Sequence, residues 1–452
     1  MKKRLLSSFS YTFLASLIGF GFNFIIAKAL GAKVYGEIVY YVSFASLIGL
    51  LVSINYSSLY MGSKITRKNK NTYSLFFTIE TIAFSIISLP AYFIIFYYIQ
   101  DRFKTVIILL VCYFMTITST SAMEYNSNKD VSRSILLGSL FPRIILVIVF
   151  SIALIIGFRS SLYYLYGMFF SYGIITIYSI TKFRPKFYLD TSIFRRAWKF
   201  YFLGIIGTGF TYVFQIIQKE YGSYEELATL SIALLFFTGL GLMDRVLVKF
   251  ALPKVHEYFE AGNIDKIGEL YSNNTFLSIM LNLPILVWVT FNIDLIAMIL
   301  GKSYKLLPDF FSILLVGYFA NMITGITGYL LRATEHEKFE MYNEVTRTVV
   351  GLVAFFLLKD CQYGVPIALS LSMLVYNVLK YVEIYYLYRF VPIRLDRKSI
   401  YYILIVALSF FVSNRIDNLY TKIITDIFLF SILYLILFKY IKDNRDIFKG
   451  YM

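Results

Sequence analysis

The feature that most constrains this chain is a succession of apolar runs. Each run is about 18 to 24 residues long, the length that crosses the hydrocarbon core of a bilayer as an α-helix. The sequence is 58% hydrophobic and 15% charged, whereas a soluble domain carries roughly 25% charged residues. A soluble domain of this composition lacks the polar side chains to cover its surface, and the alternating segments of about ten residues typical of membrane barrels are absent. The sequence therefore predicts an all-α polytopic membrane protein.

The apolar runs predict about 14 transmembrane helices. The predicted spans are, roughly, 9–27, 38–60, 75–98, 105–123, 134–157, 162–181, 200–217, 228–251, 275–291, 311–330, 346–358, 364–385, 400–413 and 422–440. The run from Phe9 to Ala27 follows a basic tail but has no small-residue cleavage pattern, so we interpret it as an uncleaved first helix. An even number of spans places both termini on the same side of the membrane.

Two pairs of segments indicate an internal repeat. Asp130–Ile135 resembles Glu344–Val349 residue by residue, and a weaker match pairs Ile25–Gly31 with Ile216–Gly222. Between the two halves lies a basic stretch in which Pro185 prevents a continuous helix. The sequence thus predicts two pseudo-symmetric six-helix bundles plus two C-terminal helices. The expected parts are an N-terminal lobe at 1–181, a cytoplasmic basic linker at 182–199, a C-terminal lobe at 200–389, and two further helices with a cytoplasmic tail at 390–452.

The basic residues predict the orientation of the chain. Of the 43 Lys and Arg residues, 29 fall in segments on the side that holds the amino terminus, 11 fall on the other side and three lie inside spans. Basic residues remain on the cytoplasmic side of a membrane. We therefore expect both termini to be cytoplasmic. We interpret the net charge of +16 as a reflection of the orientation of the chain in the membrane rather than as a nucleic-acid-binding surface.

Several function classes find no support in the sequence. No loop is long enough for a soluble catalytic domain, and His256 and His336 are far apart in predicted cytoplasmic loops. Cys112 and Cys361 have no metal-binding spacing and predict no disulfide. We expect no enzyme activity, no cofactor, no metal and no nucleic-acid partner.

Charged residues inside spans are the candidate functional residues, because each costs about 2.5 to 3.5 kcal/mol at the middle of a membrane. A cationic cavity between the lobes would lower the cost of moving an anionic phosphate or acidic sugar. The candidates for substrate binding are Arg143, Arg245, Lys249, Arg332, Lys28 and Lys380. The candidates for binding a coupling ion are Glu80 and Asp244. The alternatives are basic side chains that extend to the interface and acids that pair with neighbouring helices.

Five glycines lie on the first and seventh spans, at equivalent places in the two halves. They are Gly19, Gly21, Gly204, Gly207 and Gly209. Small residues permit close approach of membrane helices. Tight packing and flexing of gating helices both remain open as explanations.

Short motifs carry a resemblance to a known family. Ile26–Gly36, with Leu30-Gly31 and Tyr35-Gly36, resembles the first-loop signature of bacterial polysaccharide flippases. Leu252-Pro253, followed by Glu260–Asn263 and Leu270-Tyr271, is similar to the linker after their eighth span. Gly328–Ala333 resembles the end of their tenth span. Ala228 and His336 stand where this family commonly has glycine, which weakens assignment to a subfamily.

These flippases belong to the multidrug, oligosaccharidyl-lipid and polysaccharide exporter superfamily. The resemblance implies a V-shaped cavity between two bundles and alternating access, with coupling to an ion gradient. Its implied cargo is undecaprenyl-pyrophosphate-linked oligosaccharide, an O-antigen or capsule repeat unit, moved across a bacterial inner membrane. Membrane lipids, a polysaccharide polymerase and a chain-length regulator are the implied partners. Open alternatives are flippases of peptidoglycan or teichoic precursors, a cation-coupled multidrug exporter, a membrane polymerase or acyltransferase, and a non-transporting scaffold.

Overall fold

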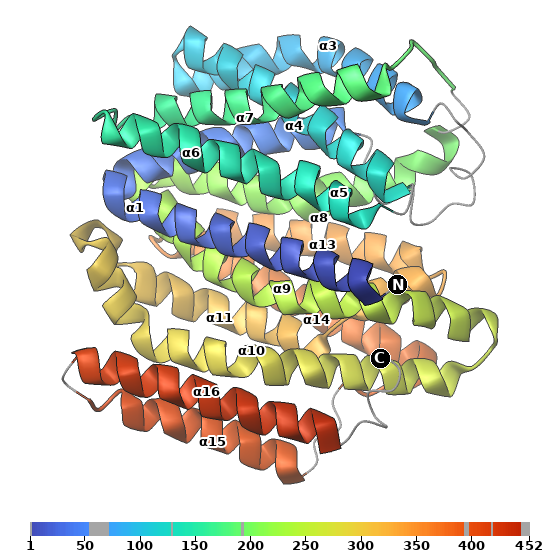
Figure 1. Cartoon of the computed structure of the whole chain (residues 1–452), viewed down its shortest axis with the longest axis vertical. Coiled ribbons are helices and arrows are strands. Elements are labelled where there is room, and N and C mark those ends of the chain that lie inside the picture. The colour runs from blue at the N-terminus through green and yellow to red at the C-terminus, as the bar shows by residue number, and fades with distance from the viewer. Residues whose placement is uncertain are drawn as a thin grey trace. The chain divides into compact units, whose positions relative to one another are not determined.

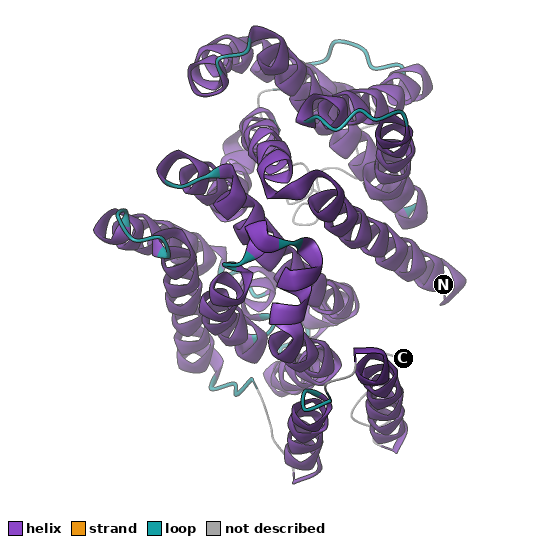
Figure 2. Ribbon diagram, turned by 90° about the vertical axis from the view of Figure 1, so that its left-hand side faces the viewer, coloured by secondary structure: helices purple, strands orange, loops and turns teal. Residues whose placement is uncertain are grey.

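The structure is a computed structural model that describes residues 2–53, 72–127, 130–190, 194–392, 397–416 and 419–443. Within these ranges every regular element is a helix (Figure 2). Nine helices of the described part are long and apolar enough to cross a membrane. The predicted all-α polytopic fold is confirmed. The chain divides into two compact units, Met1–Ser231 and Ile232–Met452, which we call unit 1 and unit 2.

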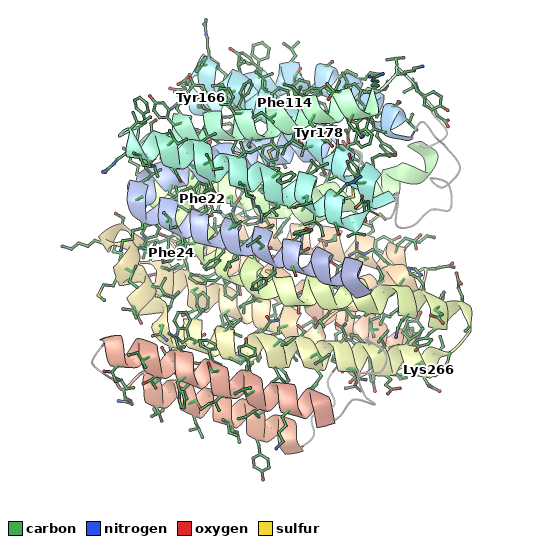
Figure 3. The ribbon with its side chains drawn as sticks, viewed as in Figure 1. Phe22, Phe24, Phe114, Tyr166, Tyr178 and Lys266 are labelled. Atoms are coloured by element: carbon green, nitrogen blue, oxygen red, sulfur yellow. The ribbon has the colours of Figure 1, made fainter. Side chains whose placement is uncertain are left out.

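The described residues of unit 1 form seven α-helices, one turn of π-helix and the start of an eighth α-helix. They are α1 (Lys2–Val52), α3 (Thr72–Ile99), α4 (Arg102–Ser127), α5 (Val131–Ile135), the π-turn η1 (Leu136–Leu140), α6 (Phe141–Ile155), α7 (Ser161–Phe183), α8 (Phe194–Tyr221) and the first turns of α9 (Tyr224–Glu260). Helix α4 is central, because it packs against α1, α3 and α7 (Figure 1). Phe114 on α4 is labelled in Figure 3. Its ring contacts Phe169 on α7, and its carbonyl accepts a hydrogen bond from Thr176.

Unit 2 contains the rest of α9 and the later helices. They are α10 (Ile264–Leu300), the 3-10 turn η3 (Lys302–Tyr304), α11 (Leu307–Thr324), α12 (Thr327–Ala333), α13 (Glu337–Leu358), α14 (Gly364–Tyr388), α15 (Arg397–Ser413) and α16 (Leu419–Asp443). Helix α14 packs against both α11 and α13, while α15 and α16 lie beside α10 (Figure 1). Asp426 on α16 accepts a hydrogen bond from the Trp288 indole of α10 at 2.8 Å. This contact joins the C-terminal pair of helices to the rest of unit 2.

Every predicted span falls on a helix, although several bounds differ and the span 38–60 extends beyond the described residues. Predicted spans one and two are the halves of α1, joined at a kink where Gly31 has a φ of 78°. Predicted span ten is two helices, α11 and α12, separated at Gly325. That residue has a φ of 64° and leaves no room for a Cβ beside Thr275. The predicted short span 346–358 is the end of α13, which begins nine residues earlier at Glu337.

The end of α7 lies close to Pro185, in the predicted basic linker. Helix α7 ends at Phe183, and Arg184 adopts a left-handed conformation directly before Pro185. The extended segment that follows lies along α3, because the backbone N–H groups of Lys186 and Tyr188 donate to Ser74 and Thr78. Residues 191–193 of the predicted linker lie outside the described residues. The division between the units falls within α9, so the predicted lobe boundaries stay a prediction.

Candidate functional site

Arg143 lies at the middle of the span Val131–Ile155 of unit 1. The chain reaches it through the π-helical turn η1, after which Pro142 and Arg143 open α6. Such π-turns are rare and frequently accompany functional sites. The Arg143 side chain reaches α1, where Nη1 donates a hydrogen bond to the carbonyl oxygen of Ala15. The guanidinium is half-buried at the centre of an apolar span.

The surroundings of Arg143 explain how it is accommodated. A Cβ added to Gly19 on α1 would lie 3.0 Å from Arg143 Nη1, so glycine provides the space that the guanidinium occupies. On α7, Tyr164 and Tyr172 are within electrostatic reach of its charge. Within the described part of the chain, no carboxylate lies within 4.0 Å of the Arg143 guanidinium, the distance that defines an ion pair. Among the described residues, the Ala15 carbonyl rather than a carboxylate therefore holds the Arg143 guanidinium.

Glu80 is the buried acid of unit 1. Its side chain is fully buried on α3, and both carboxyl oxygens lie at hydrogen-bond distance from the hydroxyl of Thr120 on α4, at 2.6 and 2.7 Å. One hydroxyl supplies one hydrogen, so it cannot satisfy both oxygens in full. A buried ionised carboxylate is costly unless it is paired. The geometry suits a carboxyl group that holds a proton or a cation.

Asp244 lies near the middle of α9 in unit 2. Its Oδ1 accepts hydrogen bonds from Ser278 and from Asn282, the latter at 3.4 Å, and both partners are buried on α10. The predicted substrate-binding residues Arg245 and Lys249 have backbones in α9, but their side chains lie outside the described residues. Asp244 thus sits in a polar stripe between α9 and α10 that sequence inspection did not anticipate.

A cluster of charged side chains occupies the interface of α12, α13 and α14. We call Arg332, Glu340, Glu344, Arg347, Tyr376 and Lys380 the unit 2 charge cluster. Glu340 lies 3.7 Å from Arg332 and 3.6 Å from Lys380. Glu344 lies 2.8 Å from Arg347. Tyr376 connects the two acids, because its hydroxyl is 3.0 Å from Glu340 Oε1 and 2.6 Å from Glu344 Oε1.

The unit 2 charge cluster is packed as well as paired. Glu340 and Glu344 are buried, and Lys380 is also buried with its ammonium 3.8 Å from the centre of the Tyr376 ring. On α12, Gly328 approaches so closely that a Cβ would lie 2.6 Å from both Glu340 Oε1 and Lys380 Nζ. Buried charges are stable only when they are paired. The close glycine and the aromatic ring therefore fix the positions of the charges.

The predicted site residues are distributed over both units. Lys28 is exposed, three residues before the Gly31 kink. Arg332 keeps 39% of its side chain exposed, whereas Lys380 is paired and buried. The structure brings Arg332 and Lys380 together around Glu340. Sequence reasoning did not single out Glu340 or Tyr376, although the spacing of Glu340, Glu344 and Arg347 places all three on one helix face.

Comparisons with known structures agree on the fold. The lipid II flippase MurJ in an inward closed conformation matches with a TM-score of 0.66 at 15% identity, covering 95% of this chain and 98% of MurJ. A MOP superfamily transporter from Pyrococcus furiosus matches with a TM-score of 0.56 at 12% identity, covering 84% and 94%. An inward-facing multidrug resistance MATE transporter matches with a TM-score of 0.57 at 12% identity, covering 83% and 93%. No protein-family model and no curated protein matches the sequence.

These comparisons identify the class. The chain is a multi-pass helical membrane protein with the fold of MOP superfamily transporters. The likeness to MurJ spans nearly the whole of both chains. At these identities the likeness concerns the fold, and the cargo has to be argued from the side chains.

Proposed function

We propose that this chain is a flippase that moves undecaprenyl-pyrophosphate-linked oligosaccharide, an O-antigen or capsule repeat unit, across a bacterial inner membrane by alternating access. The observation that carries the proposal is Arg143, a half-buried guanidinium at mid-span with no carboxylate at ion-pair distance in the described residues. A planar guanidinium binds phosphate oxygens through paired hydrogen bonds. An anionic headgroup at this depth would gain the counter-charge that it needs to leave water.

The other predicted residues extend this proposal. Arg245, Lys249 and Lys28 are proposed to continue the cationic path, with Arg332 and Lys380 contributing near the end that we expect to face the cytoplasm. Glu80 and Asp244 are proposed to bind the coupling ion, because each is an acid whose side chain meets polar groups of a neighbouring helix inside its unit. The basic bias of 29 to 11 supports cytoplasmic termini. A polysaccharide polymerase and a chain-length regulator remain proposed partners.

A second candidate function has its own support. The likeness to MurJ over 98% of that chain favours a flippase of cell-wall precursors, such as lipid-linked peptidoglycan or teichoic units. Arg143 suits this cargo equally, because both cargoes carry a pyrophosphate on a polyprenol. A cation-coupled drug exporter of the MATE type is less well supported, since cationic drugs favour acids over an arginine at mid-span.

Complementation of flippase-deficient bacteria tests the proposal. Expression in a strain that lacks its surface-polysaccharide flippase should restore surface polysaccharide, whereas rescue of a strain lacking its peptidoglycan-precursor flippase would support the second candidate. Arg143→Ala and Arg245→Ala should abolish the rescue at unchanged protein level, because the headgroup loses its counter-charge. Arg133→Ala is the matched control, because Arg133 is an exposed arginine on α5 and already pairs with Asp130. Full rescue by both Arg143→Ala and Arg245→Ala would contradict the cationic path.

A further inference from the structure

The unit 2 charge cluster has an imbalance of hydrogen-bond donors. The Tyr376 hydroxyl carries one hydrogen but lies at hydrogen-bond distance from two carboxyl oxygens, Glu344 Oε1 at 2.6 Å and Glu340 Oε1 at 3.0 Å. A phenol can donate once and can also accept. If both acids are ionised, one of the two contacts is an oxygen–oxygen repulsion in a buried site. If one acid holds a proton, it donates to the phenol oxygen and both contacts become hydrogen bonds.

The distances assign the proton to Glu340. Glu344 Oε2 lies 2.8 Å from the Arg347 guanidinium, the shortest ion-pair distance in the cluster. The two cations near Glu340 are at 3.6 and 3.7 Å, beyond the 3.5 Å limit for a hydrogen bond. Among the described residues, neither Glu340 Oε2 nor Glu344 Oε2 has a hydrogen-bond partner, so the distances to the cations distinguish the two acids. Glu340 is therefore the acid whose charge is less well stabilised.

The charges around Glu340 decide what its protonation does. Three acids and three bases meet there. They are Glu340, Glu344 and Arg347 on α13, Lys380 and Glu383 on α14, and Arg332 on α12. Tyr376 faces them from α14, Tyr318 on α11 lies within reach of Arg347, and Asn343 donates to Glu383 at 2.6 Å. With every group charged the set is neutral, so a proton on Glu340 leaves one uncompensated positive charge.

We propose that Glu340 is a proton-binding site, and that its protonation releases Arg332 and Lys380 to bind an anionic phosphate group. Arg332 makes the first contact, because 39% of its side chain is exposed. Lys380 tolerates the loss of its acid partner, because its ammonium also rests on the face of the Tyr376 ring. Release of the proton restores the Glu340 charge, which draws both cations back and expels the anion. The Lys380 ammonium already occupies the place beside Glu340 that a sodium ion would need.

Infrared spectroscopy tests the proton site without any transport assay. The full-length protein in lipid nanodiscs is titrated with pH while the stretching band of protonated carboxyl groups is recorded. We expect this band to contain a component from Glu340. Glu340→Gln should remove one part of this band, and Glu80→Gln should remove another, because Glu80 is the buried acid of unit 1. A band of unchanged amplitude in Glu340→Gln would overturn the assignment.

Two further variants keep this test decisive. Glu383→Gln is the control on α14, because Glu383 has its own donor in Asn343, and it should leave the Glu340 component in place. Tyr376→Phe removes the phenol oxygen that accepts a hydrogen bond from protonated Glu340. The Glu340 component of the band should therefore shift in frequency. If Glu340→Gln does not fold, an unshifted band in Tyr376→Phe overturns the proposal by itself.

The release of the two cations is tested with inorganic pyrophosphate, a choice of anion that rests on the proposed function. Glu340→Gln mimics the protonated acid, so it should bind pyrophosphate about tenfold more tightly than the unaltered protein at neutral pH. Adding Arg332→Gln should reverse this gain, and Asp130→Asn, at an exposed acid of unit 1, should change nothing. Equal affinities in Glu340→Gln and the unaltered protein would overturn the release. Neither the infrared titration nor the pyrophosphate binding requires transport of a lipid. Both results can therefore be interpreted even if the complementation experiment fails.

Discussion

The pairs Asp130–Arg133 in unit 1 and Glu344–Arg347 in unit 2 are the same motif in different surroundings. Both occupy the matching segments of the predicted repeat, and both form ion pairs between residues three apart, at 3.3 and 2.8 Å. The side chains of Arg133 and Asp130 are 66% and 37% exposed, whereas those of Arg347 and Glu344 are 12% and 10% exposed. A local sequence pattern therefore determines the pairing, while tertiary structure determines its energetic importance.

The neighbours of each pair account for this difference. Asp130 is the N-cap of α5, where its carboxylate accepts from the Arg133 backbone N–H. Its principal role is to satisfy the first turn of a short helix. Glu344 lies in the second turn of α13 and receives an additional hydrogen bond from Tyr376. Burial makes these extra donors necessary, because water no longer supplies them.

The largest expected effect follows from breaking the buried pair. Glu344→Ala leaves the Arg347 guanidinium buried without its closest acid and should lower the free energy of unfolding by about 3 to 5 kcal/mol. Reversible unfolding in mixed micelles measures the change. The double variant Glu344→Ala with Arg347→Ala is the control, because it removes both charges and should recover part of the loss. A loss in the free energy of unfolding smaller than the loss caused by breaking the exposed Asp130–Arg133 pair would contradict the comparison.

A smaller effect is expected from crowding the unit 2 charge cluster. Gly328→Ala places a Cβ 2.6 Å from Glu340 Oε1 and Lys380 Nζ, so both side chains must move. Overpacking of this kind costs about 1 to 3 kcal/mol. Gly21→Ala on α1 is the matched control, because no atom lies within 4 Å of the added Cβ. The same unfolding assay should show Gly21→Ala neutral or stabilising, and an equal loss in both variants would show that crowding is not the cause.

The smallest effect is expected at the exposed pair. Arg133→Ala should change the free energy of unfolding by no more than about 0.5 kcal/mol, because an exposed ion pair of this type contributes little. Asp130→Ala should cost about 1 kcal/mol, because it also removes the N-cap of α5. Thermal unfolding monitored by circular dichroism separates the two. Equal costs would assign the stabilisation to the ion pair instead of the cap.

The fold was largely predictable from the sequence because hydropathy is summed along the chain. Each predicted span falls on a helix, and Pro185 correctly indicated the end of α7. The start of α13 was missed because Glu337, Glu340 and Glu344 lower the apparent hydropathy of this helix, although Glu340 has cationic partners on α12 and α14. The split of the tenth span required the left-handed conformation of Gly325, which residue type alone does not specify.

The candidate site was less predictable because its contacts join distant segments. The expectation that charges within spans are functional made Arg143, Glu80 and Asp244 candidate residues. Sequence inspection could not show that Arg143 has a backbone carbonyl as its partner, since Ala15 is 128 residues away. Nor could it show that Lys380 is already paired with Glu340 on another helix. Whether Arg143 binds cargo stays a prediction.

The bend at Gly31 makes the register of α1 unusually sensitive to insertions and deletions. A single residue with a φ of 78° connects its two halves, so no loop can absorb a change in length. Removing one residue after Gly31 would rotate the second half of α1 by about 100°. Glu37 and Tyr40 would then turn away from Ser161 and Glu220, to which they are hydrogen-bonded. The junction between the first two spans is therefore a poor place for an epitope tag.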